Sequence, residues 1–166
     1  CVKLYNKDED YAEYVKGTLQ DEFRTDEELK TLEDYLLTIT EQNPNHKAAN
    51  ELLLWLYMQQ KNFNKAFLQA KAIDKRFKKQ GNQLFEIGRI AFENKDYVAT
   101  EKILGYFVEQ YPNSEIYYIP ARRYLIRAKE EVVKNTYPID KEKVKSIIDA
   151  YQSLVSSQGK TKAVEA

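Results

Sequence analysis

The sequence predicts an all-α solenoid of about eight helices arranged as four antiparallel pairs. The first observation is a repeat, because Lys61-Asn62-Phe63-Asn64-Lys65-Ala66 returns 34 positions later as Lys95-Asp96-Tyr97-Val98-Ala99-Thr100. A fixed period of this size is typical of helical repeat arrays. The second observation is composition: the 166 residues include only 5 Gly and 4 Pro, which leaves few turn residues for an all-β fold.

The individual helices follow from apolar residues that recur at three- and four-residue steps. Six segments carry such a face: 8–24, 26–43, 47–60, 82–94, 97–111 and 121–133. A seventh helix is predicted after the turn at Asn62, with Ala66, Phe67, Ala70, Ile73 and Phe77 on its inner face. Asp140 is expected to cap an eighth helix, because a side-chain oxygen at that position accepts from free backbone N–H groups.

Pro120 disturbs the helical pattern of the last pair. Ser114 is expected to cap the helix that follows Pro112, yet Pro120 comes six residues later, where a backbone donor should be in use. Pro120 must therefore kink this helix or delay its start. The final residues, 157–166, are small and charged, and we expect a flexible tail there.

Charge and cysteine content narrow the function classes. Lys plus Arg equals Asp plus Glu at 26 each, so net charge offers no argument for a nucleic-acid partner. No run of 18 apolar residues exists, so no transmembrane segment is predicted. Cys1 is the only cysteine and suggests a lipid-modified N-terminus. We favour the alternative, a fragment edge, because Val2 and Leu4 follow directly instead of a small polar tether.

The sequence contains no recognisable catalytic constellation. His46 is the only histidine, and neither a zinc site nor a Ser-His-Asp triad can be assembled around it, so we interpret it as a solvated turn residue. The glycines at 81, 88 and 105 are dispersed, so no phosphate-binding loop is predicted. We therefore expect a protein that is not an enzyme and that needs no cofactor or metal.

The repeated segment resembles the tetratricopeptide repeat, whose pattern has a large apolar residue early in helix A and an alanine in helix B. With Lys47 as position one, the matches are Leu53, Tyr57, Asn62-Phe63, Ala66, Ala70 and Ile73. With Gly81 as position one, the matches are Leu84, Ile87-Gly88, Ala91, Asp96-Tyr97, Leu104, Phe107 and Pro112. Gly88 falls at the pattern's glycine, which lets two helices approach closely. The departures include Asn50 for the early Trp and Leu54 for the glycine.

The resemblance implies a right-handed α-α superhelix in which neighbouring repeats complete each other's core. It divides a single domain, 1–156, into a degenerate pair at 8–46, repeats at 47–80 and 81–114, and a variant pair at 115–156. The run from Asn50 to Lys61 is similar to central repeats of long Bacteroidetes cell-envelope proteins. That similarity implies a fragment of such a protein in the periplasm or cell envelope, and a cytoplasmic location stays open. An end-to-end dimer through the terminal helices is a further expectation.

In this family, helix A lines a concave face that binds a protein or peptide. Carried over by position, the groove candidates are Glu51, Trp55, Met58, Gln59, Phe85, Arg89, Phe92, Glu93, Arg123 and Arg127. One repeat position gives a column of Trp55, Arg89 and Arg123, which could bind an acidic or C-terminal peptide through charge-assisted hydrogen bonds. Two alternatives stay open: Trp55 in the core, and Arg89 paired with a neighbouring glutamate. Glu51 and Trp55 argue against the family's carboxylate clamp for chaperone tails.

Three functions are compatible with these observations. The preferred one is a non-catalytic protein–protein interaction scaffold whose partner the sequence does not identify. The second is an outer-membrane assembly or secretion lipoprotein, because the run 108–114 is similar to repeat ends in that group. The third is a regulatory module fused to an enzyme or a DNA-binding domain.

Overall fold

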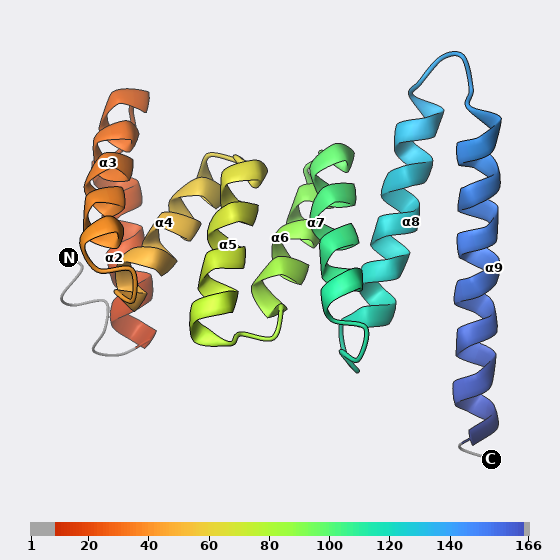
Figure 1. Cartoon of the computed structure of the whole chain (residues 1–166). Coiled ribbons are helices and arrows are strands. Elements are labelled where there is room, and N and C mark those ends of the chain that lie inside the picture. Colours follow the sequence, from red (N-terminus) through yellow and green to blue (C-terminus); the bar gives the residue numbers. More distant parts are fainter. Residues whose placement is uncertain (1–8, 165–166) are drawn as a thin grey trace. The chain divides into compact units, whose positions relative to one another are not determined.

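The structure, a computed structural model, describes the backbone of residues 9–164 and the side chains of residues 12–156 (Figure 1). Cys1, on which the lipid-anchor hypothesis depends, lies outside this range. Within it the chain is all-helical, which confirms the predicted fold class at that level. The eight helices are α2 (Glu9–Glu22), α3 (Asp26–Gln42), α4 (Lys47–Gln59), α5 (Phe63–Phe77), α6 (Asn82–Glu93), α7 (Tyr97–Gln110), α8 (Tyr118–Lys134) and α9 (Lys141–Val164).

The chain divides into two compact units, one ending at Lys78 and one beginning at Lys79. The first contains α2–α5, with α4 packed against both α3 and α5. The second contains α6–α9, with α7 packed against both α6 and α8 and with α6 also touching α8. The single solenoid predicted for residues 1–156 and its superhelical path stay predictions. None of the helices described has the length and apolar character needed to cross a membrane.

The 34-residue repeat corresponds to a repeated backbone turn. Asn62 N–H donates to Tyr57 O at 2.9 Å, and Asp96 N–H donates to Ala91 O at 3.0 Å. The residue before each turn has a left-handed backbone, at Lys61 (φ 52°) and Lys95 (φ 63°). A left-handed residue followed by this six-residue hydrogen bond is a Schellman helix end, which satisfies carbonyls that the helix leaves unpaired.

The last residue of each turn also starts the next helix. The Asn62 side chain accepts from Lys65 N–H at 3.2 Å, and the Asp96 side chain accepts from Ala99 N–H at 2.9 Å. One polar residue thus ends helix A and caps helix B, which explains why Asn or Asp recurs at this position. The same capping chemistry confirms the prediction for Asp140, whose Oδ1 accepts from the N–H of Glu142 at 3.0 Å and of Lys143 at 3.2 Å.

The start of α8 differs from the prediction for Ser114. Its Oγ accepts from Tyr117 N–H at 3.4 Å, so Ser114 closes a turn and α8 begins only at Tyr118. Pro120 is the third residue of α8, and Ala121 N–H makes the bond back to Tyr117 O at 2.8 Å. Because the first-turn N–H groups of a helix have no intrahelical acceptor, a proline is tolerated there. Of the two predicted consequences of Pro120, the structure has the delayed start.

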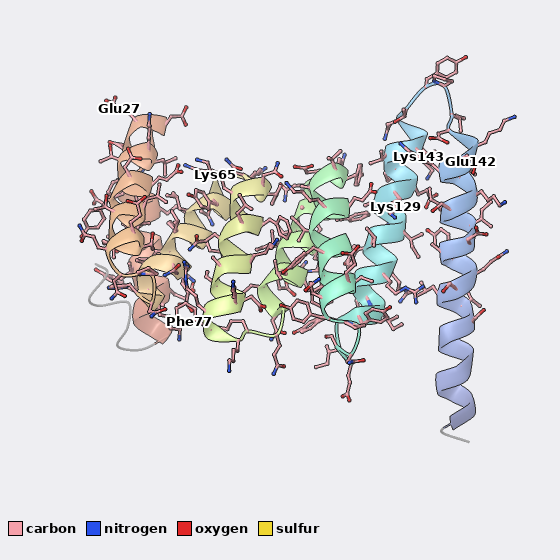
Figure 2. The ribbon with its side chains drawn as sticks, in the orientation of Figure 1. Glu27, Lys65, Phe77, Lys129, Glu142 and Lys143 are labelled. Carbon is pink, nitrogen blue, oxygen red and sulfur yellow. The ribbon has the colours of Figure 1, made fainter. Side chains whose placement is uncertain are left out.

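The C-terminal helix is longer than the sequence predicts. We expect a flexible tail at 157–166, whereas α9 continues as helix through Val164, and 165–166 lie outside the described residues. The segment contains no proline, and the one glycine in it costs a helix only about 1 kcal/mol relative to alanine. The helix packs on α8 through a cluster formed by Ile126, Val133, Ile147 and Leu154. Lys129 of α8 and Lys143 of α9 lie at the polar edge of this contact (Figure 2).

Two sets of polar contacts link helices of the first unit, one around Asn50 and one around Glu33. The fully buried Asn50 donates from Nδ2 to Pro44 O at 3.0 Å and to His46 O at 2.9 Å. Its Oδ1 accepts from Gln69 Nε2 at 3.0 Å and from Arg76 Nη1 at 3.2 Å. All the hydrogen-bonding capacity of the Asn50 amide group is therefore engaged, which is what makes a polar residue tolerable in a core.

The second contact joins three helices through Glu33 of α3. Tyr57 Oη donates to Glu33 Oε1 at 3.1 Å, and Lys65 Nζ binds the same oxygen at 2.6 Å. Lys65, at the start of α5 (Figure 2), also lies 5.3 Å from the centre of the Tyr57 ring. Burial, followed by the charge of Glu33, raises the pKa of Tyr57. The phenol therefore stays protonated and keeps donating well above neutral pH.

Candidate interaction surface

The predicted groove residues of the second unit fall on two helices that touch each other, α6 and α8. Phe85, Arg89 and Phe92 are spaced by four and three residues, so they share one face of α6. Arg123 and Arg127 are one turn apart on α8. The structure thus brings these five candidates to one region of the second unit.

Phe85 lies at the base of this region and is buried, with 6% of its surface exposed. Its ring lies 4.8 Å from that of Tyr117, 6.1 Å from that of Phe107 and 6.4 Å from that of Tyr124, measured between centroids. Aromatic pairs at such separations stabilise a core beyond their simple burial. Phe85 therefore supports the surface and offers a partner little area of its own.

Phe92 is half-buried and forms the apolar centre of the face. Its ring lies 5.2 Å from that of Tyr124 and 5.4 Å from that of Tyr97, both in edge-to-face orientation. The guanidinium of Arg127 lies over the Phe92 ring at 5.0 Å from the centroid. This cation–π contact holds a charged group that is exposed to solvent in a defined position.

Arg89 is engaged within its own helix. Its guanidinium binds Glu86 at 2.8 Å and also pairs with Glu93, three and four residues away. The hydrogen bond to Glu86 raises the pKa of Arg89. The sequence left open whether Arg89 faces a ligand or pairs with a neighbouring glutamate, and the structure shows the pairing. A ligand carboxylate would therefore have to compete with the carboxylates of Glu86 and Glu93.

Arg123 differs from Arg89 because it is exposed and makes no ion pair within the described part of the chain. Arg127, one turn on, faces Glu130, and that carboxylate is itself paired with Lys134 at 2.8 Å. The pKa of Glu130 is lowered by its hydrogen bonds from Lys134 and Tyr151. Arg123 and Arg127 are consequently more available to a ligand than Arg89.

The remaining candidates lie on α4 in the first unit. Trp55, Glu51 and Met58 are half-buried, and Gln59 is exposed, whereas Leu52, Leu53 and Leu56 beside them are buried. Trp55 is thus neither a fully buried core residue nor a fully exposed one. Because Trp55 belongs to the first unit and Arg89 and Arg123 belong to the second, the column that these residues were predicted to form stays a prediction.

Tyr124, which falls in the predicted helix at 121–133, is not among the groove candidates predicted from the sequence. The structure places it between Phe85 and Phe92, so that it links the two aromatic positions of α6. The signal was present in the spacing, since Tyr124 comes three residues before Arg127 and therefore shares its side of α8.

His46 has a structural role that differs from the interpretation as a solvated turn residue. Its Nδ1 accepts from Ala49 N–H at 3.3 Å, so the half-buried ring caps α4. Within residues 9–164, no group of three or more His, Cys, Asp or Glu residues is arranged to hold a metal ion. The arrangement on α6 and α8 combines exposed cations with a half-buried aromatic ring, since Arg127 lies over Phe92.

No family model matches the sequence, and neither the curated proteins nor the solved structures include a significant match. The tetratricopeptide resemblance, the cell-envelope location and the nature of the partner therefore stay predictions.

Proposed function

We propose that the chain is a tetratricopeptide-like solenoid segment and a non-catalytic scaffold whose α6–α8 face binds an acidic peptide segment. The observation that carries this proposal is the pair Arg123 and Arg127, exposed one turn apart on α8, with Arg127 over the Phe92 ring and Phe92 against the Tyr124 ring. The ligand class is a peptide with carboxylate side chains or a free C-terminal carboxylate.

The chemistry of the face favours carboxylates. A guanidinium presents a planar fork of N–H donors that matches a carboxylate in a bidentate arrangement, and such charge-assisted bonds are stronger than neutral ones. Arg127 is already positioned by its contact with the Phe92 ring, so less side-chain freedom is lost when it binds a ligand. Tyr and Arg are also the residues most enriched at binding hot spots.

The two glutamates on α6 limit the expected affinity for an acidic peptide. Glu86 and Glu93 neutralise Arg89, so this arginine should contribute less to binding than Arg123 and Arg127. Because the contributing charges are exposed, the affinity should fall as salt concentration rises. We expect dissociation constants in the micromolar range, as befits a small and partly neutralised patch.

Three observations support the solenoid part of the proposal. The same Schellman turn with a capping Asn or Asp occurs twice at a spacing of 34 residues. In the second unit, α7 packs against α6 and α8 while α6 touches α8, which is the contact pattern of stacked helix pairs. Gly88 also allows a close approach of α6 and α7, as the repeat pattern requires.

A peptide selection tests the proposal directly. A display library of random peptides with free C-termini would be panned on the chain, on an Arg123→Glu/Arg127→Glu variant and on a Lys75→Glu control. Lys75 is an exposed cation on α5, in the other unit. The chain and the control should enrich the same acidic peptides, and the arginine variant, at an unchanged melting temperature, should not. Enrichment of the same peptides by all three proteins, or of peptides without acidic residues, would refute the proposal.

A further inference from the structure

The connection between α7 and α8 lies in the second unit (Figure 1). A hollow of about 530 Å³ is lined there by Gln80, Asn82 and the run from Gln110 to Tyr117. Arg123 and Arg127, the cations of the proposed peptide face, are not among its lining residues. Ligand pockets in proteins have volumes of roughly 300–1,000 Å³, so this hollow is large enough for a drug-sized molecule.

Amide side chains are frequent among the lining residues. Four of the ten lining residues carry a primary amide, and none of these four side chains makes a hydrogen bond within the described part of the chain. These amides belong to Gln80, Asn82, Gln110 and Asn113. Two tyrosines, Tyr111 and Tyr117, supply aromatic rings, and Glu115 is the one charged residue of the lining. No lysine or arginine lines it.

This composition favours one ligand class over others. The lining has no lysine or arginine, so it offers a phosphate or carboxylate no charge-assisted hydrogen bond from a side chain. A calcium ion takes six to eight oxygen ligands and usually several carboxylates, whereas this lining has one carboxylate. A neutral polar ligand fits better, since each amide both donates and accepts hydrogen bonds and so matches a group that does both.

We propose that the hollow binds a neutral saccharide of about disaccharide size, a size that fits its volume. Sugar hydroxyls donate and accept, as the four amides do, and the Glu115 carboxylate can accept from a further hydroxyl. The C–H faces of a sugar ring are apolar and can pack on the tyrosine rings. An extended peptide fits less well, because its alternate side chains need pockets of their own.

The aromatic walls of the hollow are held by the core beneath them. The Tyr111 ring lies 5.3 Å from that of Phe107, and the Tyr117 ring lies 4.8 Å from that of Phe85. Gly81, with φ 79°, allows this packing, because a Cβ atom there would lie 2.7 Å from Tyr111 Cδ2. These rings need little rearrangement on binding, which lowers the entropic cost of holding a ligand.

One further backbone feature belongs to the same place. Gln80, which lines the hollow, has a left-handed backbone with φ 55°. The same conformation occurs at Lys61 and Lys95, where it belongs to a turn between helices, and at Gln80 it belongs to the turn that precedes α6.

The test is an NMR titration of the ¹⁵N-labelled chain with maltose, cellobiose, lactose and chitobiose. The pocket variant is Asn82→Ala/Gln110→Leu. Its matched control is Asn45→Ala/Gln42→Leu in the first unit. Asn45 is an exposed Asn like Asn82, and Gln42 is the last residue of α3 as Gln110 is the last residue of α7. Both variants should melt within a few degrees of the parent chain, because all four side chains are exposed.

We expect at least one disaccharide to shift the side-chain amide signals of Asn82, Gln110 and Asn113 saturably. The pocket variant should weaken that binding at least tenfold, and the control should bind like the parent. The proposal is wrong if none of the four sugars shifts these signals, or if both variants bind equally. It is also wrong if a neutral blocked peptide such as acetyl-tetra-alanine amide shifts the same amides and the sugars do not, since the hollow would then be a peptide site.

Discussion

Gly88 of α6 lies directly against Leu104 of α7, so closely that a Cβ atom at position 88 would lie 2.5 Å from Leu104 Cγ. Both residues are buried, and Leu104 is fully so. The absence of a side chain at 88 therefore sets the distance between the two helices of this pair. This contact lies in the second unit, in which α6 also touches α8 and carries part of the proposed binding face.

Gly88→Ala should destabilise the chain by roughly 1–3 kcal/mol, because the added methyl group overpacks the contact with Leu104. Gly105→Ala is the matched control, since Gly105 lies inside α7 with nothing within 4 Å of a Cβ atom. Alanine there should stabilise the helix by about 0.5–1 kcal/mol. Thermal unfolding followed by circular dichroism measures both. Shifts of the same sign in the two variants would contradict the described packing of α6 on α7.

Asn50→Ala should cost about 2 kcal/mol or more. The substitution removes the side-chain hydrogen bonds to Pro44 O and His46 O and the acceptor shared by Gln69 and Arg76, all made by a fully buried amide. Asn45→Ala, in the same turn but exposed, should change the free energy of unfolding by less than about 0.5 kcal/mol. Urea titrations of the two variants give the comparison. Equal, small effects would show that Asn50 does not hold the turn against α4.

Tyr57→Phe should alter the response to alkaline pH. The pKa of Tyr57 is raised from its ordinary value of 10.0, first by burial and then by Glu33. The folded state therefore holds the phenolic proton more tightly than the unfolded state does. This contribution is fully present below pH 10 and is lost as the pH rises above that value.

At neutral pH, Tyr57→Phe should lose about 1 kcal/mol with the hydrogen bond to Glu33. Between pH 9 and 11 the free energy of unfolding should decline less steeply in Tyr57→Phe than in the parent chain, since other tyrosines titrate equally in both. Parallel curves over this range would show that Tyr57 is not protected. Urea unfolding at each pH provides the measurement.

The two capping residues of the repeated turn should contribute similarly to the free energy of unfolding. Asn62→Ala and Asp96→Ala should each cost about 1 kcal/mol, the usual effect of losing a side-chain cap. Because the two caps lie on different helices and share no partner, their effects in the double variant should add to within about 0.5 kcal/mol. Chemical unfolding of the three variants measures this. A negligible cost at either position would mean that the turns are not equivalent.

The helices were predictable because their signals are local. Apolar spacing along α2 to α7 and the cap at Asp140 depend only on neighbouring residues, and the structure has helices at those places. The repeated turn was equally accessible, since Asn62 and Asp96 recur at a fixed spacing with the same role. The close approach at Gly88 came from the family pattern, because a lone glycine does not indicate what lies against it.

The remaining features depend on contacts that sequence spacing cannot resolve. The helical spacing that puts Phe85 beside Arg89 on α6 does not reveal that Tyr117 and Phe107 cover its ring. The pairing of Arg89 with Glu86 and Glu93 was recognisable as an alternative, yet the choice depends on side-chain geometry. Ser114 has a capping side chain, but Pro120 shifts the first available helical turn beyond it.

A calorimetric titration with one selected acidic peptide tests whether the α6–α8 face binds such peptides through Arg123 and Arg127. The chain, Arg123→Lys/Arg127→Lys, Arg123→Glu/Arg127→Glu and the Lys75→Glu control would be compared at two salt concentrations. The dissociation constant should rise at least tenfold with the glutamate variant and less with the lysine variant, which keeps the charge but loses the planar fork. It should stay unchanged in the control and weaken with salt in the parent chain. An affinity within twofold of the parent for the glutamate variant would show that the α6–α8 face is not the binding site.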